Sequence, residues 1–442
     1  MACLALSGCG SQPVSLDRMS SALAQELDRA PARKSDFTRV AIDISEGMVP
    51  AITAAVNGHE AYRSALFAER DALGGIGVAT SVRRPQLSGS ATLGLVREDG
   101  AGQSDTTTGA AGGINLSQIL YDGGESTAGV NRATAAALMA RAEREARGND
   151  LALQAASAWI DVWQYSERLH YLQTRVSELQ TVLAQIERMA TSGMLDRSVV
   201  DSARRELVTL ALEETRLITD LAEARVRYDR FFRGKVLQLE RPAPVVTTNQ
   251  ALDLAADWRR APRLERSAAE LVVARSELAS ANAAFGPRAR LQAGVTSPLE
   301  QSESTDSSVG LVLDYAFSDG GLRQSQRRAA VARVASAEAG LADARLSLQS
   351  ELEVAVARLL SIDRSLELLR EKVELTASEV QTARSQIVTG QASLRQLIDT
   401  ELEGLRAVDQ RFATYADQLK LQLTIASLTG ALGDLIGLSE VL

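Results

Sequence analysis

The sequence predicts an α+β membrane protein made of two copies of one unit, each with a β-hairpin and a long helical hairpin. The chain has 442 residues and repeats its own pattern. Gly123 and Gly320, each the first glycine of an Asp-Gly-Gly sequence, are 197 residues apart, and so are Gly193 and Gly390. Two copies of a unit of about two hundred residues are therefore favoured over unrelated domains.

Two long helices are predicted by the spacing of apolar residues. The expected helices are 125–190 and 322–388. Within them, at 172–190 and 352–387, apolar residues recur at steps of three and four, which is a coiled-coil seam. At 1.5 Å per residue the two helices give rods about 100 Å long. Rods of that length exceed what a globular core needs.

Each rod is followed by a short break and a second helical range. Returning helices are expected over 198–232 and 396–430, so each break is the tip of a helical hairpin. Gly193 and Gly390 mark these tips. Two shorter helices are expected before the strands, over 59–83 and 262–285. A short helix and a returning helix stacked end to end would together be about as long as one rod.

Four ranges alternate polar and apolar residues with the period of a β-strand. In the first, Leu87 and Leu93 fall on one side and Ser88 and Thr92 on the other. Each range has about ten residues, the length that crosses a bilayer at a tilt. Polar loops join them into two hairpins. The expected strands are 86–96, 110–121, 288–297 and 308–318.

The apolar side of these strands needs a partner. The helices use their seams to pack on each other, so lipid is the remaining apolar partner for the sheet. Four strands leave two open edges, and an unpaired backbone group in hydrocarbon costs several kcal/mol. Other copies of the chain must therefore close the sheet.

The two Asp-Gly-Gly sequences mark the places where a strand passes into a rod. Tyr121 in the first unit and Tyr315 and Phe317 in the second occupy positions typical of a membrane boundary. Glycine permits backbone angles closed to other residues, and aspartate can cap the helix that follows. The predicted strand-to-helix junctions are Asp122, Gly123, Gly124, Asp319, Gly320 and Gly321.

Composition and charge exclude other classes of protein. The formal net charge of −8 argues against a nucleic-acid partner, because such surfaces need clustered Lys and Arg. Aromatic residues make up only 4% of the chain, which suits long helices better than a compact enzyme core. His59 and His170 are the only histidines, and there is no glycine-rich phosphate loop. We therefore expect no enzyme activity, no metal and no cofactor.

The duplicated order of elements resembles the TolC-like outer-membrane efflux protein family, the outer membrane factors. The order is strand hairpin, "YDGG" or "FSDGG", long helix, "SG" or "TG" tip and returning helix, twice over, across residues 57–433. In that family three copies form a twelve-stranded outer-membrane β-barrel, continued by an α-helical tunnel through the periplasm. The resemblance implies a homotrimer that contacts outer-membrane lipid and docks on a periplasmic adaptor (membrane fusion) protein and an inner-membrane pump.

The resemblance also implies a constriction near the helical tips. Family members narrow the tunnel with a ring of acidic residues, for which Asp399 and, in the first unit, Asp201 are the candidates. Gln396 stands where some members carry a second aspartate, which departs from a two-tier acidic ring. Solvated carboxylates on the helix faces are the alternative interpretation. Gly193 and Gly390 would belong to tips that the adaptor grips, or would be turn glycines without a partner.

The N-terminal sequence suggests a lipid anchor. "LALSGC" resembles the cleavage sequence of bacterial lipoproteins, with Cys9 as the lipidated residue. The run before it is short and lacks a basic region, which also fits an incomplete start. The expected divisions are a signal remnant at 1–9, an equatorial segment at 10–56, a first repeat at 57–232, a linker at 233–256, a second repeat at 257–433 and a tail at 434–442.

Together these features predict a passive export duct. It would be the outer-membrane channel subunit of a tripartite efflux or type I secretion system, in the cell outer membrane with a periplasmic extension. The alternative is a soluble or lipid-tethered periplasmic coiled-coil scaffold whose alternating ranges are ordinary hairpins. The two differ in their need for detergent, since only the duct would aggregate without it.

Overall fold

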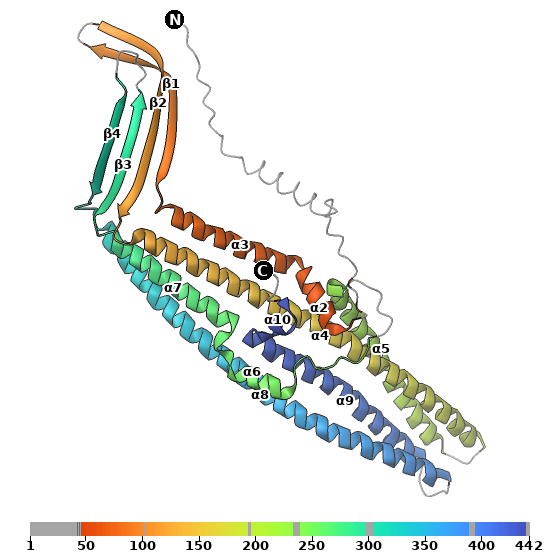
Figure 1. Ribbon diagram of the computed structural model, residues 1–442. Coiled ribbons are helices and arrows are strands. Elements are labelled where there is room, and N and C mark those ends of the chain that lie inside the picture. The colour runs from red at the N-terminus through yellow and green to blue at the C-terminus, as the bar shows by residue number, and fades with distance from the viewer. Residues whose placement is uncertain are drawn as a thin grey trace.

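The computed structural model describes residues 42, 44, 46–100, 103–192, 196–232, 239–297, 304–388 and 394–438. A four-stranded antiparallel sheet stands at one end of a long helical bundle (Figure 1). The strands are β1 Gln86–Gly100, β2 Gln103–Tyr121, β3 Arg288–Ser297 and β4 Asp306–Asp314. The helices are α2 Met48–Asn57, α3 Glu60–Ser81, α4 Glu125–Thr191, α5 Arg197–Phe232, α6 Thr248–Ala256, the 3-10 turn η1 Trp258–Arg260, α7 Pro262–Ala283, α8 Leu322–Val388, α9 Leu394–Thr429 and α10 Ala431–Leu435.

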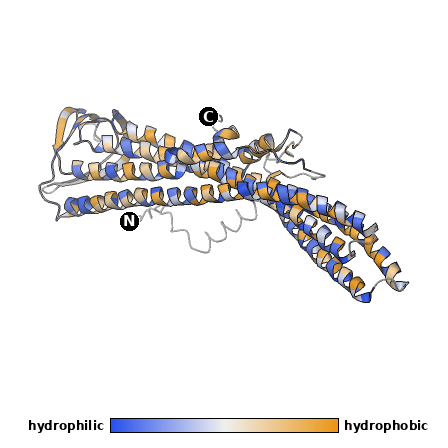
Figure 2. Ribbon diagram, turned by 90° about the horizontal axis from the view of Figure 1, so that it is seen from below, coloured by the Kyte–Doolittle hydropathy of each residue, from blue (hydrophilic) through white to orange (hydrophobic). Residues whose placement is uncertain are grey.

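The rods α4 and α8 run most of the length of the bundle. Each has 67 residues, or about 100 Å at 1.5 Å per residue. In the half near the sheet, α3 packs on α4 and α7 packs on both rods. In the other half, α5 packs on α4 and α9 packs on both rods. Two shorter helices thus accompany each rod, and the bundle bends about midway (Figure 2).

The largest buried core lies where the helices of the two halves meet. Trp159 packs edge-on against Phe232 of α5, with ring centroids 5.4 Å apart. One turn later, Trp163 packs edge-on against Tyr415 of α9 at 5.8 Å. Aromatic pairs of this geometry add about 0.5–1.5 kcal/mol beyond the burial of their area. This aromatic core joins α4 to both returning helices.

The sheet joins the two repeats. The strand order is β1-β2-β3-β4, so β2 of the first repeat pairs directly with β3 of the second. All three pairings are antiparallel. Within the described ranges, no helix is both long enough and apolar enough to cross a membrane.

The strand ends differ from the sequence expectation. The first hairpin continues through residues expected to form a polar loop, because backbone pairing between two strands does not require apolar alternation. β4 occupies Asp306–Asp314 instead of 308–318. Its partner β3 begins at Arg288, directly after Pro287, which has no N–H to donate, so residues 315–318 have no opposing strand. The expected helix ends differ from the observed ones by at most two residues.

The linker expected at 233–256 contains a helix, α6. Thr247 and Gln250 form a capping box, in which the Thr247 N–H donates to Gln250 Oε1 at 2.9 Å and the Gln250 N–H donates to Thr247 Oγ1 at 3.4 Å. The linker lies on α9, because the Tyr415 hydroxyl donates to the carbonyl of Pro242 at 3.1 Å. The Thr-x-x-Gln spacing was the sequence signal for this helix.

Candidate functional site

The sheet has one apolar face and one polar face, set by the register of its strands. Residues directly opposite each other in antiparallel strands point to the same face. Each row of opposed residues therefore crosses all four strands on one side of the sheet. The row Leu87, Leu116, Ala293 and Val309 is apolar, and the adjacent row Ser88, Asn115, Gly294 and Ser308 is polar apart from its glycine.

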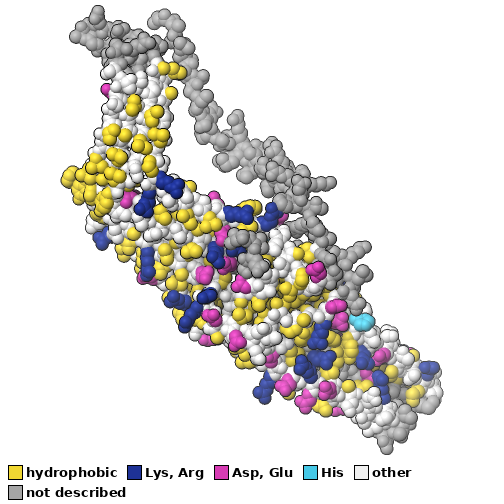
Figure 3. Space-filling model, viewed as in Figure 1, with side chains coloured by type: hydrophobic (Ala, Val, Ile, Leu, Met, Phe, Trp, Pro, Cys, Tyr) yellow, Lys and Arg dark blue, Asp and Glu magenta, His cyan; other side chains and the backbone are white. Residues whose placement is uncertain are grey.

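The apolar face is exposed in the single chain. Val309 is 79% exposed, Leu311 65% and Leu93 85%. In Figure 3, the sheet shows mostly hydrophobic and uncharged side chains, whereas the acidic and basic side chains gather over the helices. An exposed apolar surface of this extent marks a contact with lipid or with another chain.

The two outer strands leave open edges. β1 and β4 stand at the ends of the strand order, and among the described strands neither has a partner on its outer side. Unpaired N–H and C=O groups cannot face hydrocarbon without a cost of several kcal/mol each. A lipid-facing sheet of this kind needs strands from other chains.

Aromatic side chains lie at the helix-proximal ends of the strands. Tyr121 is the last residue of β2 and is more than half exposed. Just beyond β4, Tyr315 and Phe317 pack edge-on with ring centroids 5.0 Å apart. Phe317 is 91% exposed. These positions suit the interface between membrane and water.

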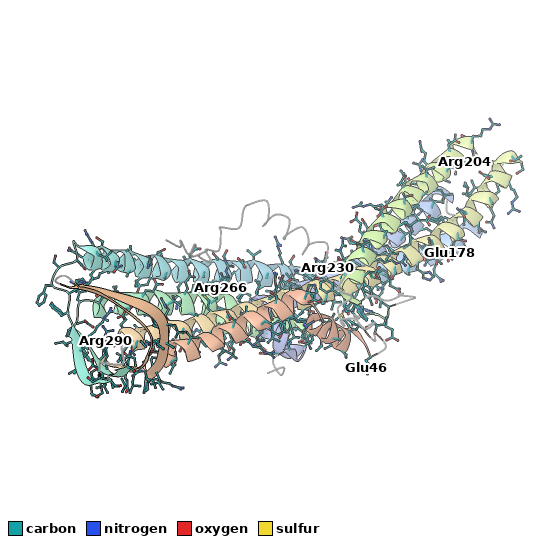
Figure 4. The ribbon with its side chains drawn as sticks, turned by 90° about the horizontal axis from the view of Figure 1, so that it is seen from above. Glu46, Glu178, Arg204, Arg230, Arg266 and Arg290 are labelled. Atoms are coloured by element: carbon teal, nitrogen blue, oxygen red, sulfur yellow. The ribbon has the colours of Figure 1, made fainter. Side chains whose placement is uncertain are left out.

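The polar face ends in two ion pairs beside the helices. Arg290 Nη2 lies 2.5 Å from Asp314 Oδ2, and Arg288 Nη2 lies 2.6 Å from Glu125 Oε2 of α4. Figure 4 places Arg290 at the sheet end of the molecule. These residues line a cavity of about 880 Å³ with Asp122 and the end of α3. The sequence interpretation missed both pairs, because neither is local in sequence.

Asp122 closes the first strand-to-helix junction. Its carboxylate accepts hydrogen bonds from the N–H of Gly124 at 3.0 Å and of Ser126 at 2.8 Å. Gly123 and Gly124 have φ angles of +67° and +95°, a left-handed conformation that favours glycine. A Cβ on Gly123 would also lie 3.1 Å from the carbonyl oxygen of Ala283 at the end of α7. Burial opposes ionisation of Asp122, but the hydrogen bonds outweigh it and hold its pKa below the usual value.

Asp319 closes the second junction in the same way, with an added clamp. It accepts from the N–H of Gly321 and of Arg323, both at 3.0 Å, and from Arg323 Nε at 2.6 Å. These bonds from Arg323 lower the pKa of Asp319. Arg323 also donates to the carbonyls of Ala284 at 3.2 Å and Ala316 at 2.7 Å. The first junction has Ser126 where the second has Arg323, so only the second ties the strand end to both helices through a side chain.

The tip candidates lie at the end of the bundle far from the sheet. Asp201 of α5 and Asp399 and Gln396 of α9 are exposed. The residues beside them, Val200 and Ile398, belong to one buried apolar cluster, so the two hairpins pack on each other there. Within the described ranges, neither carboxylate forms an ion pair or hydrogen bond. Arg204 and Glu178 mark this end in Figure 4. The candidates outside the described residues are Gly193, Gly390 and Cys9.

Ion pairs that the sequence interpretation missed hold the bundle between sheet and tips. Arg168 of α4 makes two hydrogen bonds to Asp409 of α9, at 2.6 and 2.9 Å. Asp161 of α4 contacts Lys420 of α9 and lies 3.3 Å from Arg227 of α5. Their partners are far apart in sequence, so no local spacing indicates them. Among the described residues, no group of three or more His, Cys, Asp or Glu is arranged to hold a metal ion.

The architecture is that of solved outer-membrane channels. The CmeC channel of Campylobacter jejuni has a TM-score of 0.72 at 13% identity, covering 86% of this chain and 85% of its own. VceC of Vibrio cholerae has a TM-score of 0.74 at 15% identity, covering 86% and 96%. The open state of the MtrE channel of Neisseria gonorrhoeae has a TM-score of 0.71 at 16% identity, covering 87% and 88%. No curated protein sequence matches the chain. The chain therefore shares the fold of these solved structures.

The sequence itself identifies the family. Residues 52–229 and 258–434 match the outer membrane efflux protein family, and these ranges fall on the two repeats. The chain belongs to that family, which confirms the resemblance to TolC-like proteins. It is therefore an outer-membrane efflux channel, and members of that family are transport conduits.

Proposed function

We propose that three copies of the chain assemble into a closed duct across the outer membrane. The exposed apolar face of the sheet is the observation that carries this proposal. Four strands from each of three copies make a twelve-stranded barrel in which β4 of one copy pairs with β1 of the next. The apolar rows then face lipid and the polar rows face a water-filled lumen, the arrangement of membrane barrels.

The duct is passive, and its partners supply energy. It serves as the outer-membrane component of a tripartite efflux or type I secretion system, with a periplasmic adaptor and an inner-membrane pump at the helical end. Gly193 and Gly390 belong to the tips that the adaptor contacts. Asp399 and Asp201 narrow the lumen near those tips, with Gln396 as a neutral neighbour, and Cys9 carries a lipid. The long helices α4 and α8, with 67 residues each, give the duct its length on the helical side.

A water-soluble scaffold is the competing function. It would leave Leu93, Val309 and Leu311 in water, and exposing apolar surface costs about 25 cal/mol per Å². No described helix covers these side chains, so lipid is the favoured environment.

Planar-bilayer recording tests the duct directly. Protein purified in detergent and added to a bilayer should give stepwise currents from trimeric particles. The same protein should aggregate when detergent is removed without lipid. A monodisperse, detergent-free monomer that conducts no current would support the scaffold and contradict the duct.

A further inference from the structure

A cavity with three arginines lies where the linker crosses the second helical hairpin. Its volume is about 180 Å³. Arg241 comes from the linker, Arg370 from α8 and Arg411 from α9. The aromatic rings of Trp163, Phe412 and Tyr415 and the side chain of Leu366 complete the lining.

Aromatic rings hold two of these guanidinium groups in place. Arg241 Cζ lies 4.3 Å from the ring centroid of Tyr415, and Arg411 Cζ lies 6.0 Å from that of Phe412. Tyr415 also fixes the linker through its hydrogen bond to Pro242. Contacts with ring faces orient a guanidinium and leave its N–H groups available to an acceptor.

Among the described residues, no ion pair neutralises the arginines of this cavity, of which Arg241 and Arg370 are exposed and Arg411 is half-buried. Within the described part of the chain, Arg241, Arg370 and Arg411 form no ion pair and no side-chain hydrogen bond. Glu367 and Glu374 of α8 stand three and four residues from Arg370 but form no ion pair with it among the described residues. Two other acids of the same helices are engaged elsewhere. Asp409 is bound by Arg168, and Asp363 accepts a hydrogen bond from Gln418. The chain as a whole is acidic, with a net charge of −8, so acids to pair with these arginines are plentiful.

At the positions equivalent to Arg370 and Arg411, the first repeat has one neutral and one acidic residue, which pair with each other. Gln173 of α4 and Glu214 of α5 stand 197 residues before Arg370 and Arg411. There, Gln173 Nε2 donates to Glu214 Oε1 at 2.9 Å. The second repeat therefore replaces a satisfied contact by two cations. Like charges that line one cavity repel each other, and an anion between them would remove that repulsion.

We propose that this cavity binds a small multivalent oxyanion of the phosphate class. Guanidinium forks match the oxygens of phosphate in geometry and charge, and three of them can surround one tetrahedral anion. A volume of about 180 Å³ admits a phosphate or a compact phosphomonoester and excludes a folded segment. The inference does not depend on the transport role. The bound anion joins the linker to α8 and α9.

A titration with inorganic phosphate tests the site. Full-length protein in detergent micelles is titrated at constant ionic strength, with chloride as the replaced anion. Tryptophan fluorescence reports on Trp163 together with Trp159 and Trp258, and thermal melting reports on stability. The variant Arg370→Gln/Arg411→Glu copies the residues of the first repeat. The variant Arg225→Glu/Arg358→Gln has the same charge change at exposed positions outside the cavity.

Wild type should show saturable fluorescence and a melting temperature that rises with phosphate. The copied variant should bind phosphate at least tenfold more weakly, and should melt at a higher temperature than wild type without phosphate. Arg241→Gln should also weaken binding, and the charge-matched variant should respond like wild type. Equal responses in wild type and the copied variant, or no saturable response in wild type, would overturn the site. Bilayer conductance of the same samples reports on the duct separately.

Discussion

At the scale of single residues, the two junction aspartates turn a strand into a rod. Each carboxylate accepts two backbone N–H groups at the first turn of its helix, where the helix dipole also favours negative charge. The glycines that follow adopt left-handed backbone angles. The short sequence Asp-Gly-Gly therefore encodes a change of direction and a helix start together.

Removing the charge of Asp122 should weaken the first junction. We expect Asp122→Asn to lower the free energy of unfolding by about 0.3–1 kcal/mol at neutral pH, because it removes a negative charge at the helix N-terminus and one of the two acceptor oxygens. Because folding lowers the pKa of Asp122, its contribution is complete above the unfolded pKa, near 3.8, and is lost as the pH falls through the folded value. Melting temperatures of wild type and variant should therefore converge below that pH. The exposed Asp71→Asn is the control, and a constant difference down to acidic pH would contradict this role.

The buried pair of Arg144 and Glu69 should be sensitive to loss of one partner. Arg144 Nε lies 2.5 Å from Glu69 Oε2, both side chains are buried, and Arg144 also donates to the Tyr62 hydroxyl at 3.2 Å. We expect Glu69→Ala to cost about 3 kcal/mol, because the buried Arg144 is then left with only the partly exposed Glu145, 3.7 Å away, as a counter-charge. The double variant Glu69→Leu/Arg144→Leu should lose less stability than Glu69→Ala. Thermal melting of the two variants gives the comparison.

The exposed pair of Arg266 and Glu143 provides the comparison for that experiment. Its atoms lie 3.0 Å apart, but both side chains are more than half exposed. Glu143→Ala should change stability by less than about 1 kcal/mol. If Glu69→Ala and Glu143→Ala lost a similar amount of stability, burial would not determine how much the Arg144–Glu69 pair contributes.

The sequence indicated the caps but not these pairs. Asp122 and Asp319 could be predicted, because a cap acts on N–H groups two to four residues ahead. Arg323 was missed, although it lies within the same turn, because its acceptors Ala284 and Ala316 are set by the packing of α7 and the end of β4. The partners of Arg168 and Asp161 are brought together only by the fold.

At the scale of elements, the sheet is defined by its two faces. Period-two alternation predicted both faces, because side chains of a strand must alternate. The ends of the strands could not be predicted from alternation alone. Tyr315 and Phe317 continue the pattern beyond β4, but a strand needs a partner, and β3 starts only at Arg288. Conversely, the first hairpin extends through polar residues because its backbone is paired throughout.

A charge on the apolar face should prevent insertion. We expect Val309→Lys to cost about 2–4 kcal/mol, the penalty for lysine facing lipid near the middle of a bilayer. Ser308→Lys is the matched control, because the adjacent residue lies on the polar face. The measurement is the fraction of Val309→Lys and of Ser308→Lys that is recovered from membranes in the folded state. Equal recovery of the two variants would show that Val309 does not face lipid.

At the scale of the whole molecule, the duplicated unit places a sheet at one end and helical tips at the other. If the tips narrow the lumen, three copies of Asp399 raise the local cation concentration. Asp399→Ala should then lower the cation-over-anion permeability ratio by roughly a factor of two or more in planar bilayers. Asp417→Ala, on the exposed surface of α9 away from the tip, is the charge-matched control. Unchanged conductance and selectivity would remove Asp399 from the constriction.

The open edges of the sheet should be closed by sister copies of the chain. Disulfide cross-linking between β1 and β4 tests it most directly, in a background where Cys3 and Cys9, the only cysteines, are changed to serine. Ser88→Cys is combined in turn with Ser308→Cys and Gly310→Cys, since disulfides form only between closely opposed backbones. At least one combination should give a ladder of dimers and trimers that ends at three copies. A chain that stays monomeric and water-soluble in every combination would contradict the account.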